Sequence, residues 1–418
     1  MEKKKQSNIL TVVACLVVMF SIGIVYLWSV FQGPATQHYV LWDSASARML
    51  SSIMIFMFIF GNMIGGFLQD KWSPRFVILF GAGLFFAGLF LTSLLGVNAA
   101  PWTAYITYGA VAGCGVGFAY AGSLNCIQKW FPHRRGFASG LSVCAFGLSA
   151  VVLAPLSEKL LVLPAFGENA VPLTFRTIAI VFTVLIVIAG LFVKNPKEEY
   201  LKSLNLPAKH TNQKQYTPGE VVKTAPFWCL VLTVFFLPSV FFILNPLVKT
   251  LAVFREIPAA QASLTISLSG IVQAVSRLLC GIVSDKIGRA RTVFIIAVLS
   301  LIAAILITFV TGWFYTVVVW LIFFVYAGPS SIYPAMATDA YGTKHSGGNY
   351  GIALIFLGIS SPVFTIISNQ INADGAVTGD YTTSFVLAAC VCIVPLVALP
   401  LFDMFKKRMQ KKEAENQV

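Results

Sequence analysis

One arginine, Arg277, lies inside an otherwise apolar stretch that runs from about Ala259 to Ser284. A charged side chain at the depth of a lipid bilayer costs roughly 2.5–3.5 kcal/mol even on the lower insertion scales, so such a residue is usually retained for a function. Helical periodicity places Arg277 on a stripe of small and polar residues. The stripe consists of Ser269, Gly270, Gln273, Arg277, Cys280, Gly281 and Ser284. A guanidinium on such a face can bind a carboxylate through two parallel hydrogen bonds; the alternative is an arginine held by the carbonyls of a broken neighbouring helix.

Several aromatic side chains have the depth and chemistry to contact the same anion. Tyr120 lies nine residues before Lys129 and Arg277 eight before Asp285, so both lie roughly 12–14 Å from the ends of their stretches. A phenol offers a hydrogen-bond donor to a carboxylate and a flat apolar wall for a short carbon skeleton. The predicted substrate-binding residues are Arg277, Tyr120, Tyr326, Tyr26, Trp28 and Gln273, with Trp28 as a gate or wall. For each aromatic residue the alternative is a ring that is packed or interfacial.

The composition indicates a membrane protein. The chain of 418 residues is 57% hydrophobic and 11% charged, whereas a soluble domain carries about 25% charged residues. Apolar runs long enough to span a bilayer are predicted at about 8–32, 47–69, 76–96, 102–128, 136–157, 172–194, 225–252, 259–284, 291–311, 314–339, 349–370 and 384–404. The first run is too long for a signal peptide and has no small-x-small cleavage site. We therefore expect an all-α membrane protein with twelve transmembrane helices.

The net charge of +13 is distributed unevenly along the chain. Lys and Arg concentrate at both termini, in alternate loops and in a polar segment at 195–224. The opposite loops hold Arg48, Lys159, Arg176, Lys249 and Arg255. By the positive-inside rule both termini lie in the cytoplasm, and we expect a multi-pass protein of the cytoplasmic (inner) cell membrane. The basic balance is thus a topology signal, and no nucleic-acid partner is expected.

Residue types that hold metals or perform catalysis do not cluster in the sequence. All eight cysteines fall within apolar runs, and the four histidines lie in loops or at the ends of runs. The sequence has no catalytic constellation of Ser, His and Asp and no nucleotide-binding loop. We expect no metal, no cofactor and no enzymatic activity.

The polar segment 195–224 is predicted to link an N-terminal half of six helices (1–194) to a C-terminal half of six helices with its tail (225–418). An internal repeat supports this division, because four matched pairs share one spacing: Gly66 with Gly281, Asp70 with Asp285, Lys71 with Lys286, and Gly136 with Gly351. In a short turn, glycine lets two helix ends approach, and aspartate can meet a helix N-terminus and a cation. We therefore predict a gating latch formed by Asp70, Lys71, Arg75, Asp285, Lys286 and Arg289, called the latch residues below. The alternative is a basic loop that only sets topology.

These two turns resemble the signature of the major facilitator superfamily, Gly-x-x-x-Asp-(Arg/Lys)-x-Gly-(Arg/Lys). The second copy, from Gly281 to Arg289, matches well, whereas the first has Ser73-Pro74 where the family usually has glycine. The resemblance covers essentially the whole chain. It implies the major facilitator fold, with a substrate site near the bilayer midplane between two six-helix halves, and transport by alternating access.

Further strings look like the oxalate/formate antiporter family and its monocarboxylate-transporter relatives. They are Gly23-Ile-Val-Tyr26-Leu-Trp28, Tyr120-Ala-Gly-Ser-Leu-Asn125, Lys129-Trp-Phe-Pro-His-Arg-Arg-Gly136 and Asn349-Tyr-Gly351. The resemblance implies that Arg277 binds the substrate carboxylate. Oxalate-specific members resemble one another in a lysine at the position of Leu357, and human-type monocarboxylate transporters have an aspartate at the position of Gln273.

The sequence therefore predicts a secondary active or facilitative transporter of small monocarboxylates of the lactate, pyruvate or formate class. One alternative is an oxalate:formate-type antiporter, which a second intramembrane cation would have favoured. Another is a membrane sensor that binds carboxylates without transporting them. The expected partners are the carboxylate anion and the lipid bilayer, with or without a co-transported proton or counter-anion, and we expect a monomer.

Overall fold

The chain folds almost entirely into helices in the computed structural model, which describes residues 9–197, 199–200, 214–244, 247–378 and 381–415. Within these ranges no strand is present. Twelve helical segments of the described chain are long and apolar enough to cross a membrane. The predicted all-α fold with twelve spans is confirmed.

The chain divides into two compact units. Unit 1 comprises Met1–His133, Leu141–Gln213 and Thr343–Gly351. Unit 2 comprises Arg134–Gly140, Lys214–Gly342 and Ile352–Val418. Within the predicted linker, 195–224, positions 198 and 201–213 lie outside the described residues.

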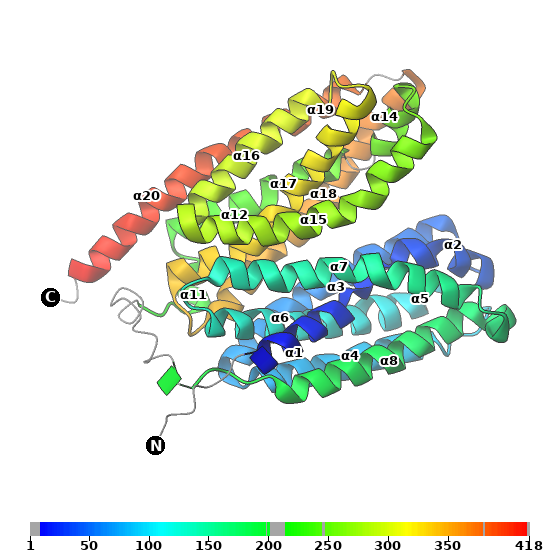
Figure 1. Cartoon of the computed structure of the whole chain (residues 1–418), viewed down its shortest axis with the longest axis horizontal. Helices are drawn as coiled ribbons and strands as arrows, with labels where there is room; N and C mark the ends of the chain where they lie inside the picture. Colours follow the sequence, from blue (N-terminus) through cyan, green and yellow to red (C-terminus); the bar gives the residue numbers. More distant parts are fainter. Residues whose placement is uncertain (1–8, 198, 201–213, 245–246, 379–380, 416–418) are drawn as a thin grey trace. The chain divides into compact units, whose positions relative to one another are not determined.

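Unit 1 is built from the helices between α1 and α8, together with the start of α18 (Figure 1). These helices are α1 (Ile9–Ser21), the 3₁₀ turn η1 (Gly23–Tyr26), α2 (Trp28–His38), α3 (Ser44–Lys71), α4 (Pro74–Thr92), α5 (Pro101–Ala104), the π-helical segment η2 (Tyr105–Ala112), α6 (Gly113–Trp130), α7 (Arg135–Leu161), η3 (Pro164–Asn169) and α8 (Ala170–Phe192). The first turns of α7 belong to unit 2.

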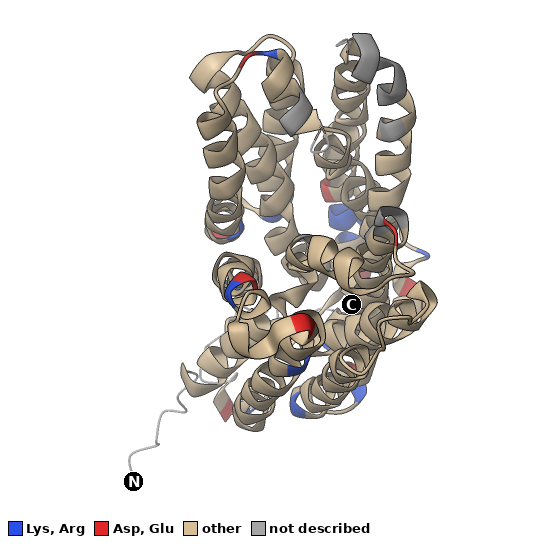
Figure 2. Ribbon diagram, turned by 90° about the vertical axis from the view of Figure 1, so that its right-hand side faces the viewer, with Lys and Arg blue, Asp and Glu red and all other residues tan. Residues whose placement is uncertain are grey.

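Unit 2 contains the remaining helices. They are α11 (Pro218–Val221), α12 (Ala225–Phe236), α13 (Ser239–Leu244), α14 (Val248–Phe254), α15 (Ala259–Ile287), α16 (Arg289–Leu306), α17 (Gly312–Tyr341), α18 (Ser346–Thr378), α19 (Thr382–Val391) and α20 (Ile393–Glu415). Inside this unit α15 packs against α17 and α16, and α16 packs against α20. Along the described helices most positions are uncharged, as expected for segments that face lipid (Figure 2).

Helix α6 lies at the centre of unit 1, where it packs against α1, α3 and α4. The spacing of Gly109, Gly113 and Gly117 predicts a close helix contact. A Cβ atom on Gly113 would lie 2.8 Å from the carbonyl oxygen of Met54 on α3, and one on Gly117 would overlap the carbonyl oxygen of Phe58. Hydrogen in place of a side chain therefore lets α3 and α6 approach with their backbones in contact.

The described end of the linker is fixed to unit 2 by polar contacts. The backbone N–H of Tyr216 donates to the carbonyl of Tyr341, and its hydroxyl donates to the carboxylate of Glu413. The backbone N–H and hydroxyl of Thr217 donate to the Glu220 carboxylate, and together with Lys214 they lower the pKa of Glu220 to about 2. This capping box starts α11, so the chain enters α12 from a defined position.

Candidate functional site

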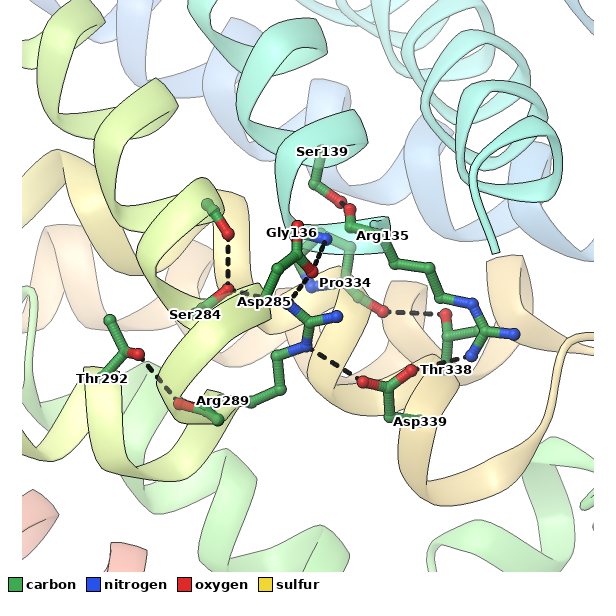
Figure 3. A network of polar contacts seen from close by, with 12 residues as sticks. Arg135, Gly136, Ser139, Ser284, Asp285, Arg289, Thr292, Pro334, Thr338 and Asp339 are labelled. Atoms are coloured by element: carbon green, nitrogen blue, oxygen red, sulfur yellow. Dashed lines mark hydrogen bonds and ion pairs between the residues drawn. The ribbon is translucent and has the colours of Figure 1, made fainter. Parts of the chain in front are cut away.

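The turn between α15 and α16 carries a network of ion pairs (Figure 3). Asp285, near the end of α15, pairs with Arg289 at the start of α16. The Arg289 Nε atom lies 3.0 Å from Oδ2 of Asp339 on α17, and Nη1 of Arg135 on α7 lies 2.7 Å from Oδ1 of the same carboxylate. These four side chains are between 5% and 20% exposed, so their charges are poorly screened by water. The network joins α7, α15, α16 and α17 within unit 2.

The Asp285 carboxylate also binds the start of α7. The backbone N–H of Gly136 donates to Oδ1 at 3.0 Å, and the backbone N–H of Phe137 donates to Oδ2 at 2.7 Å. The first N–H groups of a helix have no partner inside the helix, and its dipole favours a negative charge there. Asp285 therefore satisfies two of these donors while it pairs with Arg289.

Glycines allow α7 and α15 to meet closely enough for these bonds. A Cβ atom on Gly281 would overlap the backbone oxygen of Gly136. One turn further along, a Cβ atom on Gly140 would lie 2.6 Å from the carbonyl oxygen of Arg277. The close contact therefore extends from the ion-pair network to the level of Arg277.

We expect Gly281→Ala to destabilise the protein by about 1–3 kcal/mol, because the added methyl group forces two backbones apart. Gly83→Ala on α4 is the matched control, since a Cβ atom there would have no neighbour within 4 Å. Alanine favours a helix interior over glycine by about 1 kcal/mol, so the control should be neutral or stabilising. Melting temperatures of the two variants in the same detergent provide the measurement. A Gly281→Ala protein as stable as the control would contradict the close contact.

The equivalent turn of unit 1 is simpler. Asp70, near the end of α3, accepts a hydrogen bond of 3.1 Å from the backbone N–H of Gly348 in the first turn of α18. Lys71 is exposed and Arg75 half-buried, and Ser73 caps α4 by accepting the N–H of Phe76. This turn again joins an aspartate to a helix N-terminus. Of the predicted latch residues, Asp285 and Arg289 form ion pairs within the described part of the chain. Lys286 is exposed.

Two residues of this ion-pair network, Arg135 and Asp339, are not among the residues predicted from the sequence. Both lie at ends of predicted spans, and Asp339 is the one acidic residue in the sequence between Asp285 and Asp374. The sequence signal for Asp339 was a single carboxylate at the end of the apolar run 314–339. The ion pair with Arg135 joins segments far apart in the chain, so neither local pattern nor the internal repeat identified it.

Arg277 lies on α15 and is 5% exposed. The burial pattern of α15 follows the predicted polar stripe, because Ser269, Cys280 and Ser284 are buried as well. The large apolar residues off the stripe are 40–46% exposed: Leu264, Ile271, Val275 and Leu279. The rotation of α15 is fixed next to Arg277, where the hydroxyl of Ser276 donates a 2.6 Å hydrogen bond to the carbonyl of Phe324 on α17. A planar cation is thus held inside the protein on the side of α15 away from the exposed apolar face.

Aromatic rings accompany the predicted tyrosine of unit 2. Tyr326 on α17 is half-buried and stacks on Phe241 of α13, with ring centroids 3.9 Å apart and an interplanar angle of 15°. Phe242 meets the Tyr326 ring edge-on at 5.7 Å. Gln273, one turn before Arg277, is also half-buried. This stacking fixes the plane of the Tyr326 ring.

In unit 1 two predicted tyrosines share an aromatic cluster. Tyr120 on α6 is 4% exposed and packs edge-on against Phe58 and Phe146, with ring centroids 5.2 and 5.3 Å away. Tyr26, at the end of η1, packs against the same Phe146 at 5.1 Å and is 42% exposed. The structure therefore brings Tyr26 and Tyr120 to one phenylalanine.

Trp28 has a different environment from the tyrosines of this cluster. Its indole N–H donates a 2.7 Å hydrogen bond to the carbonyl of Ala47, and its ring packs on Tyr108. The side chain is 4% exposed. This geometry favours the packing interpretation, in which Trp28 holds the start of α2 against α3.

Comparison with protein families establishes where the chain belongs. The family model of the Major Facilitator Superfamily matches residues 11–365. The chain belongs to the Major Facilitator Superfamily. Among solved structures, the superfamily transporter FucP in its outward conformation superimposes with a TM-score of 0.72 at 13% identity, over 95% of this chain and 99% of that one, which shows the shared fold. The resemblance drawn from the two aspartate turns is confirmed, and membership identifies a membrane transporter and not an enzyme.

Two named relatives belong to the subgroups suggested by the sequence. The oxalate:formate antiporter of Oxalobacter formigenes is 24% identical over 416 residues, which cover 96% of this chain and 94% of that protein. Monocarboxylate transporter 13 of Rattus norvegicus is 32% identical over 120 residues, 28% of this chain and 27% of that protein. These similarities confirm that this member of the Major Facilitator Superfamily resembles both subgroups, as the sequence predicted.

Proposed function

We propose that this superfamily member transports small monocarboxylates of the lactate, pyruvate or formate class across the cytoplasmic membrane. The observation that carries the proposal is the burial of the Arg277 guanidinium in an apolar span of α15. Arginine is always charged in proteins and matches a carboxylate through two parallel N–H···O bonds. A buried arginine on a polar helix face can therefore bind the carboxylate group of such a substrate.

The choice of a monoanion follows from the balance of charge. In the sequence the acidic residues lie in loops, in tails or at the ends of the predicted spans, and Arg277 is the one charged residue predicted deep within a span. A monocarboxylate neutralises Arg277, so the loaded carrier closes without burying a net charge. A dianion leaves about one uncompensated negative charge, and burying such an ion costs several kcal/mol.

The remaining predicted residues have subsidiary roles in this proposal. Tyr326, held flat by Phe241, supplies a phenol and an apolar wall in unit 2. Tyr120, Tyr26 and Gln273 remain sequence-based proposals for substrate contact. The latch residues act as contacts that form and break during alternating access, with both chain termini on the cytoplasmic side. The proposal includes transport coupled to a proton or a counter-anion as well as uncoupled, facilitative transport.

Transport by purified protein in proteoliposomes tests the function directly. Labelled lactate, pyruvate, formate and oxalate are each offered to vesicles loaded with the same unlabelled anion. We expect counterflow of at least one monocarboxylate, and each of these unlabelled monocarboxylates should compete better than fully ionised oxalate. Binding without counterflow would support a sensor instead, and counterflow that prefers oxalate would overturn the charge argument.

An oxalate:formate-type antiporter is the second candidate. The full-length similarity to the Oxalobacter formigenes antiporter favours it. Against it stands Leu357 on α18, the position at which the resemblance to oxalate carriers leads us to expect lysine. A monocarboxylate site needs one intramembrane cation, whereas an oxalate site is expected to hold two. A single substitution that adds the second cation therefore tests which substrate the site favours.

We expect Leu357→Lys to weaken monocarboxylate binding on the order of tenfold, because a second cation repels Arg277 and leaves an excess positive charge. Oxalate binding should improve relative to monocarboxylate binding. Leu357→Met, which keeps size without charge, is the control and should retain the wild-type preference. Competition assays on the three proteins measure the ratio, and an unchanged preference in the lysine variant would refute the charge-matching argument.

A further inference from the structure

A polar pocket of about 360 Å³ lies at the start of α16, apart from Arg277. It is bordered by the α15–α16 turn, the end of α17 and the charged part of α20, all within unit 2. Its lining includes Gly288, Arg289, Arg291, Asp403, Lys406 and Lys407. Because α16 begins at Arg289 and is a membrane span, this end of α16 lies at a membrane surface.

The lining of this pocket carries an excess of positive charge. Asp285, Asp339 and Arg289 also border it, but they belong to the ion-pair network, which is neutral once Arg135 is included. Beyond the four side chains of that network the lining holds one anion, Asp403, and the cations Arg291 and Lys407, together with Lys406, whose charge also acts on Asp339. The first N–H groups of α16 point to the same end of the helix and favour an anion. The pocket therefore complements a singly or doubly charged anion.

A second pocket, of about 430 Å³, adjoins the first and is apolar. The two share Ala290, Arg291 and Asp403. The apolar pocket continues along α16 and α20 past Phe294, Ile295, Leu399 and Pro400. Phe294 and Ile295 belong to the exposed face of a membrane span, where acyl chains are the natural neighbours. A free phosphate would use the first pocket only, whereas a phospholipid uses both.

We propose that this groove between α16 and α20 binds one anionic phospholipid. The phosphodiester lies against Arg291, Lys406 and Lys407, and an acyl chain runs along Phe294, Ile295 and Pro400. Basic pockets next to lipid-facing helices are the form that recognition of anionic head groups takes in membrane proteins. The bound lipid covers the outer side of the ion-pair network, so the site connects the composition of the membrane to the turn between α15 and α16.

Native mass spectrometry of the purified full-length protein tests the site with phosphatidylglycerol as the probe and phosphatidylcholine for comparison. We expect at least one phosphatidylglycerol to remain bound under conditions that remove phosphatidylcholine. The double variant Arg291→Gln, Lys407→Gln should bind phosphatidylglycerol about 30-fold more weakly, since each surface cation contributes about fivefold. Arg408→Gln is the matched control, because Arg408 is an exposed cation on the same helix outside both pockets.

Two further arms separate the possible sources of the anion. Inorganic phosphate at the same concentration should not displace phosphatidylglycerol, and Ile295→Ser should weaken lipid binding without changing the melting temperature of the lipid-free protein. Displacement by phosphate would mean a site for a free anion and would overturn the proposal. Equal retention of phosphatidylcholine, or an equal loss of binding in Arg408→Gln, would overturn it as well.

Discussion

Arg277→Ala is expected to abolish carboxylate binding while leaving a folded protein in the membrane. Removing one member of a buried charge pair costs about 3–5 kcal/mol, so the affinity for a monocarboxylate should fall by about a hundredfold or more. Alanine also removes a buried charge from the empty protein, so the fold should not suffer. Binding is measured by calorimetry on the purified protein, and insertion by its melting temperature and its elution as a single species.

Arg277→Lys and Val275→Ala complete this experiment. Lysine keeps the charge, but an ammonium cannot reproduce the planar pair of donors of a guanidinium, so binding should remain badly impaired. Val275 lies two residues earlier on the exposed side of α15, and its replacement should leave affinity unchanged. Near wild-type transport by Arg277→Ala would remove the basis of the proposed function.

Asp339→Asn is expected to destabilise unit 2 by about 3 kcal/mol, because Arg135 and Arg289 lose the carboxylate that both of them contact. The replacement keeps the shape of the side chain, so the effect reports charge and hydrogen bonding. Denaturant unfolding in mild detergent measures the loss, and Lys286→Gln, an exposed charge in the adjacent turn, serves as control. A loss no greater than that of the control would show that the network contributes little.

A double-mutant cycle separates the ion pair from general damage. If Arg135 acts mainly through Asp339, then Arg135→Gln should cost much less in the Asp339→Asn protein than in the wild type. Additive losses would mean that the two residues stabilise the protein independently.

The number and type of helices could be predicted from the sequence, because the apolar runs exceed the thickness of a bilayer. The interruptions within runs could not. The predicted span at 225–252 is interrupted at 237–238, between α12 and α13, and η1 interrupts the run at 8–32. Hydropathy records whether a residue can face lipid, whereas a break depends on which backbone groups find partners in neighbouring helices.

The sequence could predict those site residues whose own type and position are unusual, but not the contacts between residues far apart in the chain. Arg277 and Asp285 are conspicuous because a charge in or at the end of an apolar run is costly. The contact between Arg135 and Asp339 was missed because it has no copy in the repeat: the matching positions hold Tyr350 and Leu124. Trp28 was predicted as a substrate-binding residue because it lies two residues after Tyr26 in the sequence. Closeness in sequence does not fix the direction of a side chain, and the Trp28 ring packs on Tyr108 instead.

The two aspartate turns are unequally equipped, and this has a kinetic consequence. The position in the first copy that matches Arg289 is Pro74, so the Asp70 turn has no equivalent of that ion pair. Detaching α7 from Asp285 breaks two backbone hydrogen bonds beside a poorly screened cluster of charges, whereas Asp70 meets backbone N–H groups at the start of α18 outside any ion pair of the described residues. We therefore expect a higher activation barrier for releasing a helix at the second turn. If transport requires both releases, as the proposed latch implies, the release of α7 is expected to be the slower step and to set the temperature dependence of turnover.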